Sequence, residues 1–158
     1  MKMQKNKTTA LTFSAIIMAM YIVIMYTTQS FAFGAYQIRV ATCLYALAYL
    51  FPFLIVPLGL ANSLSNVLGG LGILDIVGGF AVGIAAAGCA GLIRAFKLPR
   101  GLVIPVIILA PGLIVPLWLS PITGIPYWPL VLSLCIGQTV PAMLGYLLIR
   151  LLPKAGIE

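Results

Sequence analysis

Long runs of apolar residues follow one another along almost the whole chain, separated by short breaks that are polar or rich in glycine and proline. A run of about 20 apolar residues spans a bilayer as an α-helix, and somewhat shorter runs suffice where neighbouring helices shelter them. The pattern predicts six transmembrane helices, at residues 9–27, 36–51, 53–68, 73–95, 102–119 and 128–152. The fifth contains Pro105, Pro111 and Pro116, so we expect it to be kinked or irregular.

The composition favours an integral membrane protein over a soluble domain with a membrane anchor. Of the 158 residues, 63% are hydrophobic and 7% are charged, whereas a soluble domain carries about 25% charged residues. No stretch between Ala10 and Leu152 is polar enough to fold as a soluble domain. We therefore predict a single all-α membrane domain that crosses the plasma membrane several times.

The basic residues indicate which way the chain is oriented. The net charge of +7 comes mainly from the N-terminal residues 1–8, the loop 94–100 and the tail that begins at Arg150. Six spans would place all three on one side, which the positive-inside rule assigns to the cytoplasm. We therefore expect both termini in the cytoplasm. Because the charges mark topology rather than a continuous basic stripe, we expect no nucleic-acid partner.

Little in the sequence could catalyse a reaction or bind a metal. There is no histidine, and Cys43, Cys89 and Cys135 lie singly in apolar runs, where cysteines usually pack as small side chains. There is no glycine-rich nucleotide-binding loop that ends in Lys-Ser or Lys-Thr. We expect no enzyme activity, metal or cofactor, so uphill transport would draw its energy from a partner or an ion gradient.

Polar side chains inside the apolar segments are candidates for a ligand site. Arg39 and Asp75 should lie near the outer ends of their helices, where they either neutralise each other or line an outward-facing cavity. Asn62 and Asn66 share one helix face, and Gln138 lies well inside the last span; such amides either bind a ligand or only join neighbouring helices. The side chains that we expect to hold a ligand are Gln37, Arg39, Asn66, Asp75 and Gln138, with Tyr36 or Trp128 stacked on it.

The first helix has a pattern of small residues. Ala15 and Ala19 are one helical turn apart, and Ala10 and Ser14 extend the pattern. Small residues at this spacing let another helix approach closely. The pattern therefore favours close packing of another helix against Ala15 and Ala19.

Several segments resemble the queuosine-precursor transporter (QueT) family, whose members are substrate-binding S components of energy-coupling factor (ECF) vitamin transporters. The resemblance covers most of the chain and is carried by GAYQIRV at residues 34–40, LGGLGILDIVG at residues 68–78, Gly137-Gln138 and Gly145-Tyr146-Leu147. It implies a six-helix bundle with a substrate pocket near the outer surface. It also implies that Ala15 and Ala19 contact the scaffold subunit EcfT, which two ATPase subunits, EcfA and EcfA', drive with ATP.

The resemblance implies a small heterocyclic ligand, a queuosine precursor such as preQ0 or preQ1, or queuine. Family members usually have a glutamate where this chain has Thr42 and Gln138. Both departures remove a negative charge and favour a neutral precursor, a queuine-like base or another vitamin. Two other interpretations remain: a stand-alone secondary carrier, and a structural membrane subunit with no ligand.

Overall fold

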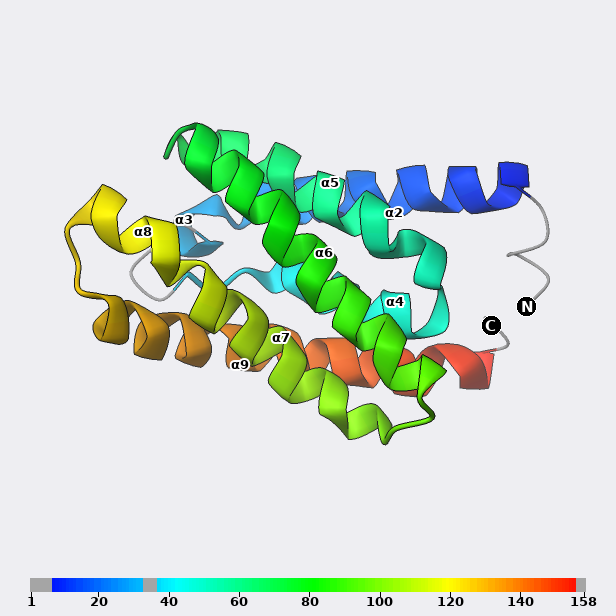
Figure 1. Cartoon of the computed structure of the whole chain (residues 1–158). Coiled ribbons are helices and arrows are strands. Elements are labelled where there is room, and N and C mark those ends of the chain that lie inside the picture. Colours follow the sequence, from blue (N-terminus) through cyan, green and yellow to red (C-terminus); the bar gives the residue numbers. More distant parts are fainter. Residues whose placement is uncertain (1–6, 33–36, 156–158) are drawn as a thin grey trace.

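Helices account for all the regular secondary structure of residues 7–32 and 37–155, the part of the chain that the computed structural model describes (Figure 1). The α-helices are α2 (Lys7–Thr27), α3 (Gln29–Ala32), α4 (Leu47–Leu50), α5 (Ile55–Asn66), α6 (Ile73–Ala95), α7 (Val103–Ile114), α8 (Pro116–Thr123) and α9 (Tyr127–Leu151). The 3-10 helices are η1 (Val40–Ala46), η2 (Pro52–Leu54), η3 (Val67–Gly69), η4 (Arg100–Leu102) and η5 (Leu152–Ala155). The long helices run up and down one bundle, and the beginning of α2 and the end of α9 lie at the same end of it (Figure 1).

Five helical segments among the described residues are long and apolar enough to cross a membrane, rather than the six that the hydropathy pattern predicts. They are Lys7–Thr27, Pro52–Gly69, Ile73–Ala95, Arg100–Thr123 and Tyr127–Lys154. The expected second span, residues 36–51, instead contains the shorter apolar helical segment Val40–Leu50. The prediction of six full spans is therefore not confirmed. The cytoplasmic location of the termini remains a prediction.

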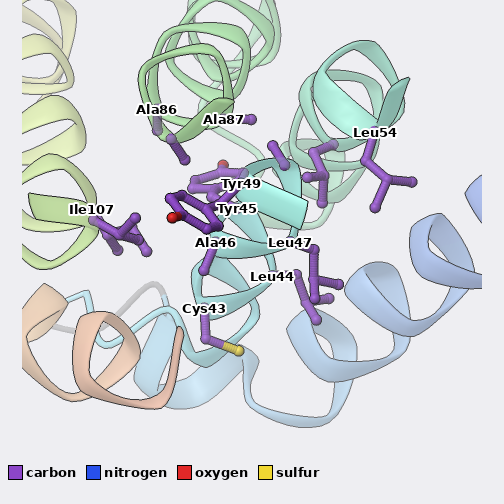
Figure 2. Close-up of a cluster of buried hydrophobic side chains, with 14 of the residues drawn as sticks. Cys43, Leu44, Tyr45, Ala46, Leu47, Tyr49, Leu54, Ala86, Ala87 and Ile107 are labelled. Atoms are coloured by element: carbon purple, nitrogen blue, oxygen red, sulfur yellow. The ribbon is translucent and has the colours of Figure 1, made fainter. Parts of the chain in front are cut away.

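The short segment Val40–Leu50 lies inside the bundle. Residues 41–51 are all buried, and η1 contacts α2, α5, α6, α7 and α9. Tyr45 is fully buried among side chains of this segment and of α6 and α7, including Ala86 and Ile107 (Figure 2). A run enclosed by protein can be as apolar as one that faces lipid, so hydropathy does not separate the two cases.

α5 and α6 pack closely because glycines face each other. A Cβ built on Gly83 would lie 2.7 Å from the Cα of Gly59. The connection between these helices turns at Gly70 and Gly72, whose φ angles of 66° and 90° suit glycine. This turn brings the polar end of α5 beside the beginning of α6.

Prolines interrupt the predicted fifth span. α7 ends at Ile114 and α8 begins at Pro116, with Pro111 and Pro121 inside the two helices. Proline removes a backbone donor and clashes with the preceding turn, which explains the break. The break directs α8 toward the beginning of α6.

Candidate functional site

Buried polar side chains from four parts of the chain meet between the helices. Gln37 and Arg39 precede η1, Thr42 lies in it, and α5, α6 and α9 supply four more: Asn62, Asn66, Asp75 and Gln138. All are buried except Gln37, which is half-buried. Polar groups inside an apolar bundle are costly unless they are paired or bind something.

Asn62 lies at the centre of one hydrogen-bond network. Its Oδ1 accepts hydrogen bonds from Arg39 Nη1 and from the Tyr21 hydroxyl, both at 3.2 Å. Its Nδ2 donates to the Gly79 carbonyl at 2.7 Å. The hydroxyls of Tyr21 and Tyr45 lie 3.1 Å apart. Asn62 therefore ties the Arg39 guanidinium to α2 and α6.

Thr42 and Gln138 contact each other, although they lie far apart in the sequence. Thr42 Oγ1 lies 2.7 Å from Gln138 Oε1 and 2.7 Å from the carbonyl oxygen of Arg39. One hydroxyl proton can be donated to only one of these acceptors at a time. Gln138 Nε2 lies 3.5 Å from the Gln37 carbonyl, which is a long hydrogen bond. Thr42 and Gln138 thus form one uncharged pair.

Asp75 joins the beginning of α6 to α5 and α8. Its carbonyl accepts from Asn66 Nδ2 at 2.7 Å, and its carboxylate Oδ1 accepts from Trp118 Nε1 at 3.0 Å. Asp75 also lies in the first turn of α6, where unpaired backbone N–H groups stabilise a carboxylate. The Trp118 ring fits over Gly78, where a Cβ would lie 2.6 Å from it.

A small cavity lies at the centre of this polar cluster. Its polar lining is Gln37, Arg39, Thr42, Asn62, Asn66 and Gln138. Its volume is about 10 Å³, room for about one water molecule. A heterocyclic ligand would therefore bind only after the surrounding elements move apart.

Several buried oxygens of the cluster have no hydrogen-bond partner among the described residues. They are Gln37 Oε1, Asn66 Oδ1 and Asp75 Oδ2. An unpaired buried acceptor costs about 1–3 kcal/mol. Gln37 also adopts a positive φ of 42°, a left-handed conformation that costs a non-glycine residue about 1–2 kcal/mol. Unpaired acceptors and backbone strain of this kind are typical of ligand sites.

The structure brings together most of the side chains that the sequence indicates. Gln37, Arg39, Asn66 and Gln138 line the cavity. The Asp75 side chain is not among the described residues that line it, and Asp75 is joined to the lining by the hydrogen bond from Asn66 to its backbone carbonyl. The structure does not bring Trp128 to the cavity: its side chain is 70% exposed and packs edge-on against Tyr127. Tyr36 lies outside the described residues.

The site also contains residues that were not among the side chains expected to hold a ligand: Tyr21, Thr42, Tyr45, Asn62 and Trp118. The sequence does single out Asn62 as a candidate, because it shares a helix face with Asn66 one turn away. Tyr21 and Tyr45 give no signal in the sequence, since buried tyrosines are common in apolar bundles. Only the packing of α2 on η1 brings them to Asn62.

The sequence was compared with models of known protein families, with curated proteins and with solved structures. A model of the QueT transporter family matches residues 11–154, which includes every residue that lines the cavity. The chain belongs to the QueT transporter family. No curated protein and no solved structure shows a significant match. Membership in QueT and the five long apolar helices make this chain a multi-pass membrane transporter protein.

Proposed function

We propose that this chain is the substrate-binding component of an energy-coupling factor importer that captures a queuosine precursor. The proposal rests mainly on the buried polar cavity of a chain that belongs to the QueT family. Acceptors in and beside the cavity lining have no partner among the described residues. The sequence contains no nucleotide-binding loop. The cavity supplies ligand recognition. The energy for uptake then comes from two ATPase subunits that act through a membrane-embedded scaffold.

The position of the site along α6 supports capture from outside the cell. Asp75 lies in the first turn of α6 and Arg94 in its last turn. These residues are nineteen positions apart on one helix, or about 28 Å at 1.5 Å per residue, close to the thickness of the hydrocarbon core. The polar cluster and the basic loop 94–100 therefore mark opposite ends of a membrane-crossing helix. If the basic end faces the cytoplasm, the site faces outward.

The exposed face of α2 is suited to the scaffold. Ala15 and Ala19 are exposed, whereas Ser14, Ile17 and Tyr21 of the same helix face the bundle. Small side chains on a free helix face allow backbones to pack closely in lipid, where no hydrophobic effect drives association. We place the scaffold contact at Ala15 and Ala19.

Co-purification tests this assignment. A tagged chain with Ala15→Leu and Ala19→Leu should fold and bind ligand but lose the scaffold and ATPases and lose ATP-driven uptake. Ala81→Leu makes the same substitution at an exposed alanine of α6 and should retain both. Full uptake by the double variant would refute the docking surface.

Reconstitution separates this proposal from a stand-alone carrier. Proteoliposomes that contain only this chain should bind a queuosine precursor without accumulating it. Uptake under a proton or sodium gradient alone, with no partner and no ATP, would refute the proposed energy coupling. It would identify a secondary carrier instead.

A further inference from the structure

We propose that this site selects an uncharged base over one that carries an ammonium group, and that the Thr42–Gln138 pair sets this preference. The inference rests on the proposed function and specifies its substrate class. It follows from the charges and hydrogen-bond groups around the cavity.

The charge of the cavity lining disfavours cations. Arg39 is the one charged residue among the described residues that line the cavity, and it is 5% exposed. The nearest carboxylate, Asp75, does not line the cavity and accepts a hydrogen bond from Trp118. A cationic ligand would share a water-poor space with a guanidinium, where like charges repel more strongly than in water.

The hydrogen-bond groups that face the cavity match a neutral base. Gln37 Oε1 and Asn66 Oδ1 are acceptors without a partner among the described residues, so they would accept from ring or amino N–H groups of the ligand. The guanidinium of Arg39 carries five N–H donors and would donate to a carbonyl oxygen. A planar base with N–H groups beside a carbonyl satisfies all three residues without bringing a charge.

Thr42 and Gln138 decide the charge because a carboxylate would fit in their place. Both are almost fully buried, at 2% and 0% exposed, and they touch at 2.7 Å. Gln138→Glu keeps the shape of the side chain, and the Thr42 hydroxyl remains positioned to donate to it. The variant would cancel the charge of Arg39 and create a site for an ammonium group.

The test compares two probes that differ in one substituent. Calorimetry on the purified full chain in detergent measures binding of 7-cyano-7-deazaguanine, which is uncharged, and 7-aminomethyl-7-deazaguanine, which is cationic at pH 7. The wild type should bind the cyano compound at least about tenfold more tightly, a difference of about 1.4 kcal/mol. Gln138→Glu should shift this ratio by about tenfold or more toward the amine. Gln29→Glu, the same substitution at an exposed position of α3, should leave the ratio unchanged.

A second measurement needs no variant. Raising the pH toward the pKa of a primary alkylamine, about 10.4, should tighten binding of the amine to the wild type but not of the cyano compound. Equal or tighter binding of the amine at pH 7, or an unchanged ratio in a folded Gln138→Glu protein, would overturn this inference alone. Binding of neither probe would overturn the proposed substrate class and the inference with it.

Discussion

Replacing Gly79 by alanine adds one methyl group at the point where α6 faces the amides of α5. The new Cβ would lie 2.5 Å from Asn66 Nδ2 and 3.5 Å from Asn62 Nδ2. Asn66 would have to turn away, which breaks its hydrogen bond to the Asp75 carbonyl. The substitution therefore disturbs the cavity lining without changing a polar residue.

The expected change in the free energy of unfolding of Gly79→Ala combines opposing effects. Alanine in place of glycine stabilises a helix interior by roughly 0.8–1.0 kcal/mol. Forcing a methyl group into a packed site costs about 1–3 kcal/mol, and the lost hydrogen bond costs about 1 kcal/mol more. Gly79→Ala should therefore lower the free energy of unfolding by about 1–3 kcal/mol. Gly88 provides the matched control on the same helix, because a Cβ there meets no atom within 4 Å, and Gly88→Ala should be neutral or stabilising by up to about 1 kcal/mol.

Denaturation of the purified proteins in detergent would measure the difference in the free energy of unfolding between the two variants, which should be about 1–4 kcal/mol. Calorimetry with the two deazaguanine probes should show binding weakened by about tenfold or more for Gly79→Ala and unchanged for Gly88→Ala. The prediction is wrong if both variants have the same free energy of unfolding, or if Gly79→Ala binds the probes as tightly as the wild type.

The remaining predictions concern single hydrogen bonds of the same site. Thr42→Val keeps the side-chain shape but leaves buried Gln138 Oε1 without the donor at 2.7 Å. Thermal unfolding should therefore show a loss of stability of about 1–2 kcal/mol. Thr42→Ser should recover most of this stability, and equal stability of the valine and serine variants would contradict the role of the hydroxyl. Trp118→Phe removes the donor to Asp75 Oδ1 and should cost about 1–2 kcal/mol and weaken ligand binding. Trp128→Phe, at a 70% exposed position, should change neither stability nor ligand binding. A larger effect at Trp128 than at Trp118 would contradict the assignment of Trp118 to the site.

The sequence determined the kind of protein and much of the site's composition. Apolar runs of membrane-spanning length indicate helices by themselves, because an unpaired backbone is too costly in lipid. The glycines at residues 69–72 mark the α5–α6 turn, since Gly70 and Gly72 take positive φ angles. Arg39, Asn66 and Gln138 stand out as polar groups in apolar surroundings, and all three line the cavity.

Only the tertiary structure decided how these pieces are used. It encloses residues 41–51 within the bundle, whereas hydropathy counts an enclosed run and a lipid-facing run alike. It pairs Thr42 with Gln138 across 96 positions and brings Trp118 rather than Trp128 to Asp75. Such pairings depend on which helix faces pack together. A single sequence does not show how close residues of different helices lie. The residue types, and with them the expected preference for a neutral ligand, could therefore be predicted from the sequence, but the direct contact of Thr42 with Gln138 at the cavity that Arg39 also lines could not.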